Sequence, residues 1–140
     1  MRIVWEKEAY RSIVCQAKKN NFSEVGGILL GYRKKNDSYI VDFTLNTSNS
    51  RSSVIINGES ESRRVSEKAA LYSPSLEFVG VWHSHINGDS SFSSQDIDMH
   101  NQLLKYYDEF LSVLFVLSPE DKNSCTTSTL VVKKTSSYPL

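Results

Sequence analysis

The sequence has little of what several classes of protein require. Its 140 residues include only two cysteines, Cys15 and Cys125, which are too few for a disulfide framework and form no CxxC pair. We expect both to be reduced thiols, Cys15 on a helix and Cys125 in a polar loop. Sixteen basic and sixteen acidic residues give a net charge of zero. Because no net field attracts a polyanion, we expect neither nucleic acid nor a membrane as a partner.

Long hydrophobic runs are also missing. The most apolar stretch, residues 110–117, is far shorter than the roughly 20 residues of a membrane-spanning helix. Charged residues recur through the first thirty positions, so that we expect no signal peptide and a cytoplasmic protein. A composition of 39% hydrophobic and 23% charged residues excludes a disordered chain. The length fits one domain, which we place at residues 1–140.

Hydrophobic patterning predicts that helices alternate with strands along the chain. Apolar residues at helical spacing predict helices over residues 8–20, 59–73 and 93–107. Apolar or alternating runs rich in β-branched and aromatic residues predict strands over residues 24–31, 39–45, 54–56, 77–85, 110–117 and 126–133. Hairpins at both ends and helices between strands indicate the α/β class, with a mixed, curved β-sheet flanked by helices.

Histidine is scarce, and its placement suggests a metal site. His83 and His85 are two of only three histidines, and Asp96 follows eleven residues after the second. Residues two apart on a strand point to the same face with Cα atoms about 6.6 Å apart, so both imidazoles can reach one metal ion. A loop over residues 86–92 reverses the chain. The helix that begins at Ser93 can then direct Asp96 back toward the histidines.

Two imidazoles and one carboxylate leave a fourth tetrahedral position for water, as in a catalytic zinc site. A structural alternative exists for part of this pattern, because Ser93 and Asp96 have the spacing of a capping box at a helix start. The His pair and the aspartate together favour a metal site with one zinc ion per chain. His100 is expected at the edge of the core or behind the ligands, and not as a fourth ligand.

A water molecule activated at such a site needs a proton acceptor beside it, and Glu24 is the candidate. This carboxylate opens the apolar run Glu24-Val-Gly-Gly-Ile-Leu-Leu-Gly31, an unusual place for a charge that only aids solubility. The alternative is an exposed charge at the end of a strand. Gly26 and Gly27 either let the backbone approach a substrate closely or relieve packing.

These residues together resemble the JAB/MPN metalloprotease family, whose JAMM motif combines an upstream Glu, a His-x-His pair, and an Asp preceded by a Ser at three residues. Five positions match this pattern: Glu24, His83, His85, Ser93 and Asp96. The order of elements agrees over about residues 4–132, and the short chain resembles the stand-alone prokaryotic members. The resemblance implies the cytidine-deaminase-like MPN/JAB fold.

The resemblance also implies a function: zinc-dependent hydrolysis of a peptide or isopeptide bond at the C-terminus of ubiquitin or a ubiquitin-like protein. It assigns three zinc ligands, His83, His85 and Asp96. It assigns proton transfer to Glu24 and stabilisation of the oxyanion to Ser93. The implied partners are a ubiquitin-like protein or its conjugate, and ubiquitin-transfer-like enzymes from the same operon.

The sequence departs from the family at Ile86, where members usually carry proline, and the Asn87-Gly88 turn supplies the bend instead. Three other functions stay open: a catalytically silent MPN interaction module, a JAMM peptidase acting on a sulfur-carrier protein or a small peptide, and kinship with RadC-like proteins. The intact ligand set favours an enzyme. A substrate tail is expected to pair with the edge of the short strand at residues 54–56.

Overall fold

One mixed β-sheet organises the part of the chain that the computed structural model describes, namely residues 1–20, 22–46, 59–121 and 123–134. Its strands are β1 (Arg2–Trp5), β2 (Gly26–Lys34), β3 (Asp37–Phe43), β4 (Glu77–His85), β5 (Glu109–Leu117) and β6 (Cys125–Lys133). They lie in the order β1-β3-β2-β4-β5-β6. The pairs β1–β3 and β4–β5 are parallel, and the other neighbouring pairs are antiparallel.

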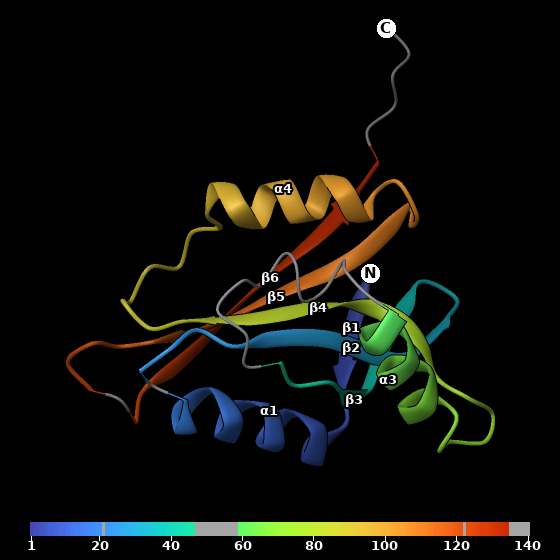
Figure 1. Cartoon of the computed structure of the whole chain (residues 1–140), viewed down its shortest axis with the longest axis horizontal. Coiled ribbons are helices and arrows are strands. Elements are labelled where there is room, and N and C mark those ends of the chain that lie inside the picture. The colour runs from blue at the N-terminus through green and yellow to red at the C-terminus, as the bar shows by residue number, and fades with distance from the viewer. Residues whose placement is uncertain (21, 47–58, 122, 135–140) are drawn as a thin grey trace, which may run out of the picture.

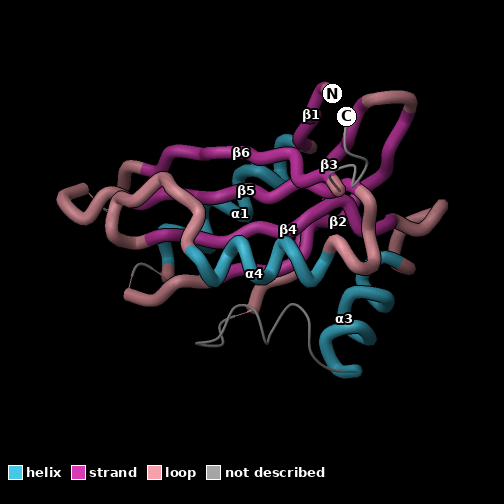
Figure 2. The backbone as a smooth tube through the Cα atoms, turned by 90° about the horizontal axis from the view of Figure 1, so that it is seen from above, coloured by secondary structure: helices cyan, strands magenta, loops and turns pink. Residues whose placement is uncertain are grey.

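Three helices are described, and they lie on both faces of this sheet. They are α1 (Lys7–Lys19), α3 (Glu59–Ala69) and α4 (Ser94–Leu103). Figure 1 shows α1 and α4 on opposite faces of the sheet, and Figure 2 shows α4 running along β4. α3 contributes to the same hydrophobic cluster as α4. The expected α/β class, a mixed curved sheet flanked by helices, is therefore confirmed. None of the described helices has the length and apolar character that crossing a bilayer requires.

α1 forms because its apolar residues recur every four positions and face the sheet: Ala9, Ile13 and Ala17 are buried. The Glu6 carboxylate accepts a hydrogen bond from the Ala9 N–H at 2.9 Å and caps the first turn. At the other end, the backbone N–H and the side-chain amide of Asn20 both donate to the Gln16 carbonyl. The helix thus begins and ends within one residue of the predicted 8–20.

The sequence predicts the central strands better than the sheet edges. β4 has the expected bounds, and β5 begins one residue before the expected start. The sequence does not predict β1, because four residues are too few to show a period. The sequence predicts Cys125 in a polar loop, but this residue is the first of β6 and lies opposite Leu117. The predicted short strand at 54–56 lies outside the described residues.

β2 continues through Lys34, although the sequence predicts its end at Gly31. Arg33 pairs with Ser38 and Lys34 with Asp37, and the two-residue turn between the strands has Lys35 at φ 59°. The end of this hairpin is exposed to water. Charged side chains are tolerated there, and the hydrophobic pattern stops before the strand does.

Both later helices are shorter than predicted. α3 ends at Ala69 and α4 at Leu103, whereas apolar residues predict ends near residues 73 and 107. After α4 the N–H groups of Tyr106 and Tyr107 both donate to the Leu103 carbonyl, at 3.0 and 2.9 Å. This tightened turn redirects the chain into β5. The aromatic residues beyond the helix therefore belong to a turn.

β4 is one of the two central strands of the sheet, and its last seven residues are all buried. On the face that α1 covers, Trp82 packs in a buried hydrophobic cluster with Ile13 and Phe115, the α1-side cluster. Its indole N–H donates to the Thr44 carbonyl at 2.9 Å. Val81 packs in the cluster on the opposite face, with residues of α4. Because β2 and β5 flank β4, its C-terminal residues His83 and His85 lie inside the protein.

Two glycines at the start of β2 allow this close packing. A Cβ atom on Gly27 would lie 1.9 Å from the Thr44 carbonyl oxygen, and one on Gly26 would lie 2.7 Å from the Trp82 carbonyl oxygen. Backbone atoms cannot yield as a flexible side chain can. Of the two alternatives for these glycines, the relief of packing is therefore confirmed.

Removing the anchor of α1 tests this account of the fold. Ile13 is fully buried in the α1-side cluster. We expect Ile13→Ala to lower the free energy of unfolding by about 2–5 kcal/mol, through lost burial and a residual cavity. The exposed neighbour provides a control, and Ser12→Ala should stay within about 0.5 kcal/mol of the parent. Urea denaturation measures both, and equal stabilities would contradict the assignment.

Candidate metal centre

The end of β4 presents two histidines to the α4 side of the sheet. His83 and His85 alternate with Trp82 and Ser84, and they point to the same face as Val81. The parallel partner β5 lies beside them, with His85 opposite Val116. Their side chains are 0% and 5% exposed, so both imidazoles lie in the interior.

The first turn of α4 brings Asp96 to the same place. Ser93 is the N-cap, and its Oγ accepts a hydrogen bond from the Asp96 N–H at 3.1 Å. In return, Asp96 Oδ2 accepts from the Ser93 N–H at 2.7 Å. The capping box is therefore present, and its aspartate is also the one that faces the histidines. The capping and ligand interpretations of Asp96 do not exclude each other.

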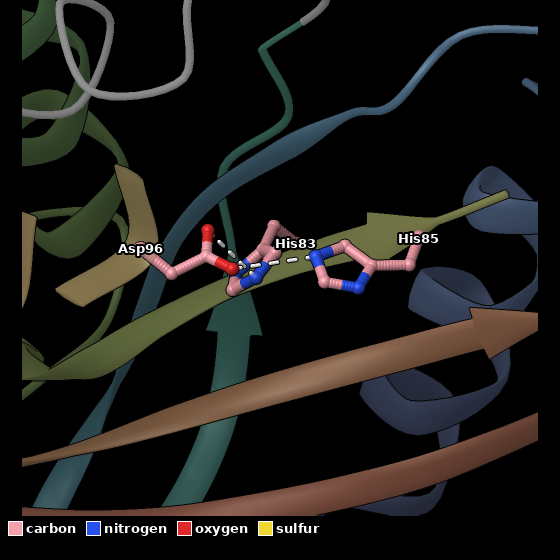
Figure 3. A group of neighbouring side chains, drawn as sticks. All are labelled: His83, His85 and Asp96. Atoms are coloured by element: carbon pink, nitrogen blue, oxygen red, sulfur yellow. Dashed lines mark ion pairs between the residues drawn. The ribbon is translucent and has the colours of Figure 1, made fainter. Parts of the chain in front are cut away.

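The three side chains converge, as Figure 3 shows. Asp96 Oδ1 lies 3.1 Å from His83 Nε2, and Asp96 Oδ2 lies 3.3 Å from His85 Nε2. One donor atom from each residue can be chosen so that all lie within 4.8 Å of one another. Ligands about 2.0–2.1 Å from a tetrahedral zinc ion are about 3.3 Å apart. The spacing and the donor types therefore fit a zinc ion, with one coordination position left open.

The electrostatics of the cluster keep the Asp96 carboxyl ionised. Burial by itself would raise its pKa, but hydrogen bonds and charge from His83 and His85, together with the Ser93 N–H, hold the pKa well below its usual range. For His85, burial by itself would lower the pKa, because it disfavours the charged imidazolium. Asp96, the Asp89 carbonyl and the charge of Glu24 outweigh this effect and raise it.

Glu24 lies next to the cluster, just before β2, the strand that pairs with β4. Its neighbour Val25 accepts from the Ser84 N–H at 2.8 Å, and the Val25 N–H donates to Ser84 Oγ at 3.0 Å. These bonds extend the ladder past Gly26 and place Glu24 near His85, whose pKa its charge raises. The glutamate is half-buried. The structure thus brings all five sequence-predicted site residues to one end of the sheet.

His100 lies behind the cluster, as the sequence predicts. The residue is 4% exposed, and its Nε2 lies 2.7 Å from Ser112 Oγ on β5. The ring also contacts Phe92, which in turn contacts His83 edge-on. Burial, and then the nearby charge of His83, lower the pKa of His100, which favours a neutral ring.

Sequence reasoning missed several residues that support the site. Ser112 pairs with His100, Ser84 joins β4 to Val25, and the Asp89 carbonyl oxygen lies 2.8 Å from His85 Nδ1. The two serines stand on strands in patterns shared by many core residues. Asp89 acts through its backbone, which residue type does not reveal. Only the Asn87-Gly88 turn signal pointed to this loop.

Comparison with known proteins agrees with this geometry. The sequence matches a family described as prokaryotic homologs of the JAB domain over residues 6–130. No curated protein gives a significant match. The solution structure of protein DSY2949 from Desulfitobacterium hafniense is similar, with a TM-score of 0.63 and 15% sequence identity. The alignment covers 94% of this chain and 85% of that one. At this identity the likeness shows a shared fold.

Ser93 can be tested as a helix cap separately from any catalysis. We expect Ser93→Ala to lower the free energy of unfolding of the metal-free protein by about 1 kcal/mol, because the Asp96 N–H loses its acceptor. Ser93→Thr should restore most of the loss. The exposed first helical residue gives a matched control, and Ser94→Ala should change stability little. Equal losses for Ser93→Ala and Ser94→Ala in chemical denaturation would rule out the cap.

Proposed function

The chain belongs to the family of prokaryotic homologues of the JAB domain, and on that basis we propose that it is a zinc-dependent peptidase acting at the C-terminus of a ubiquitin-like protein. The bond cleaved is a peptide or an isopeptide bond. One observation carries the proposal: at one end of the sheet, the oxygens of a buried carboxylate lie 3.1 and 3.3 Å from the nitrogens of two buried imidazoles. A merely structural capping box does not need the two histidines.

The donor set supports zinc as the metal. Imidazole nitrogen and carboxylate oxygen are ordinary zinc ligands, and three protein ligands are the usual number in a catalytic zinc site. The residues of the cluster are His83, His85 and Asp96. A zinc ion bound there would act as a Lewis acid toward the scissile carbonyl and the attacking water.

Two residues beside the ligands would transfer the proton and stabilise the developing negative charge. The half-buried Glu24 carboxylate would accept a proton from the attacking water and deliver it to the leaving amine. Ser93 Oγ accepts from the Asp96 N–H, which leaves the hydroxyl proton available as a donor. It would donate to the oxyanion as it forms. Proton transfer and charge stabilisation would thus come from two different segments, the one before β2 and the one before α4.

The burial of the ligands supports a slender substrate. Their side chains are 0%, 5% and 2% exposed, so only a narrow, extended segment can bring a carbonyl group to them. A diglycine-like tail of a ubiquitin-like protein has this shape, because it carries no side chains. We place the reaction in the cytoplasm, with ubiquitin-transfer-like enzymes as the source of conjugates. Both cysteines are free thiols, which suits a reducing compartment.

Metal binding is the first test. We expect one zinc ion per chain by elemental analysis, and its loss in both His83→Ala and Asp96→Ala. His100→Gln removes the third histidine but no ligand, so it should keep full zinc stoichiometry even if it lowers stability. Zinc retained in Asp96→Ala, with only stability reduced, would leave the capping box as the whole role of that residue.

The second test separates chemistry from binding. We expect Glu24→Gln to fold normally, bind zinc normally and lose at least about a hundredfold in kcat, because an amide cannot accept the proton. The exposed Glu77, at the other end of β4, gives the control variant Glu77→Gln, which should keep full activity. The assay uses a ubiquitin-like protein joined to a fluorogenic group through its C-terminal glycine.

The outcomes of that assay also separate the alternatives. Full zinc occupancy without turnover of any substrate would indicate an interaction module. Equal turnover of an isolated short tail peptide would indicate a peptidase for small peptides. Wild-type turnover by Glu24→Gln would reduce Glu24 to a charge at a strand end.

A further inference from the structure

The loop between β4 and α4 contains hydrogen bonds that the proposed reaction does not use. Asn87 Oδ1 accepts from the Asp89 N–H at 3.1 Å, and Asp89 Oδ1 accepts from the Ser91 N–H at 2.8 Å. Each side chain thus closes a turn on the backbone two residues ahead, and the two turns follow one another directly. Both side chains are exposed, so burial does not explain their presence.

The two turns meet at the carbonyl group of Asp89. This oxygen lies 2.8 Å from Nδ1 of His85, whose side chain is 5% exposed. A carbonyl oxygen can only accept, so Nδ1 must carry the proton of this hydrogen bond. Nε2 then faces Asp96 at 3.3 Å and offers its lone pair to a metal ion. The carbonyl therefore selects both the tautomer and the orientation of a ligand.

Packing also constrains this loop, but it contains no proline. Ile86 stands at its entry, so the backbone there lacks the fixed φ of a proline. Gly88 has a φ of 79°, and a Cβ atom on it would lie 3.0 Å from Pro119 Cδ in the β5–β6 turn. The loop thus lies close against that turn. The side chains of Asn87 and Asp89 supply the closing bonds on the loop itself.

We propose that Asn87 and Asp89 are positioning residues for His85. Their side chains hold the loop so that the Asp89 carbonyl receives the Nδ1 proton and Nε2 is directed to the metal. This inference deepens the proposed function, because it assumes that the cluster of His83, His85 and Asp96 binds zinc. Neither residue is expected to touch the metal or the substrate.

Four variants and one control test this role. Asn87→Ala and Asp89→Ala remove the side-chain acceptors, whereas Asn87→Asp and Asp89→Asn keep an acceptor of the same reach. Asp89→Asn also removes the negative charge while it keeps the acceptor that closes the turn. Asp121 is the matched control, because its Oδ1 accepts from the Asn123 N–H at 3.0 Å in the neighbouring β5–β6 turn with no bond to a ligand.

Two readouts are needed, and one of them can also be made without the metal. Competition with a chromophoric chelator gives the zinc dissociation constant. Nitrogen-15 NMR of the imidazoles reports which nitrogen of His85 carries the proton and how fast the Nδ1 proton exchanges with water, with and without zinc. A loop residue with a purely structural role would change the free energy of unfolding and leave both quantities unaltered.

We expect Asn87→Ala and Asp89→Ala each to weaken zinc binding about tenfold, at the lower end of the usual effect of removing a partner of a metal-bound histidine. The Nδ1 proton of His85 should exchange faster in both. Asn87→Asp, Asp89→Asn and Asp121→Ala should match the parent in both readouts.

Two results would overturn the inference: alanine variants with parental zinc affinity and parental Nδ1 exchange, or an Asp121→Ala variant that is impaired equally. If the parent itself binds no zinc, the proposed function fails. The exchange of the Nδ1 proton in the metal-free parent and its alanine variants then still decides whether these side chains position His85.

Discussion

The ionised carboxylate of Asp96 in the protein interior is the constraint on which the functional end of this fold depends. A buried charge is unfavourable by several kcal/mol unless hydrogen bonds and opposite charge compensate it. Here the compensation comes from the Ser93 N–H and from two imidazoles at 3.1 and 3.3 Å. The end of β4 and the start of α4 must therefore meet, and the short loop between them has to reverse the chain within a few residues.

Apolar clusters pack on both faces of the sheet, and the α4 face also contains the polar cluster of the candidate site. On the α1 side, Ile13, Trp82 and Phe115 belong to a cluster of apolar residues. The α4 side contains the histidines and Asp96, together with the buried pair of His100 and Ser112. Polar groups on that side are tolerated because each is held by a neighbour. Packing on the α1 side needs no such matching, and it can supply a rigid support for the cluster.

The sequence predicts the cluster of His83, His85 and Asp96 and the central strands because both depend on short-range spacing. His83 and His85 share a face through the period of a strand, and the apolar run Phe78–Trp82 just before them indicates β4. β1 is too short for a period to show, and β2 ends in charged residues that face water. The Asp89 carbonyl is a backbone group, and Ser112 meets His100 only after folding. Such contacts depend on tertiary structure and leave no local pattern.

The pairing of β2 with β4 has a consequence for how the two parts of the candidate site are held together. His83, His85 and Asp96 lie on one continuous segment of β4, loop and α4, whereas Glu24 precedes a different strand. The register of the ladder, with Gly26 opposite His83, sets Glu24 beside this cluster. A slip by one residue would turn the glutamate to the α1 face and leave the cluster of His83, His85 and Asp96 intact. Positions 26 and 27 have no room for a Cβ atom, so a slip that moved a larger residue into either place would cause a clash. The two glycines therefore fix the position of Glu24 relative to the cluster.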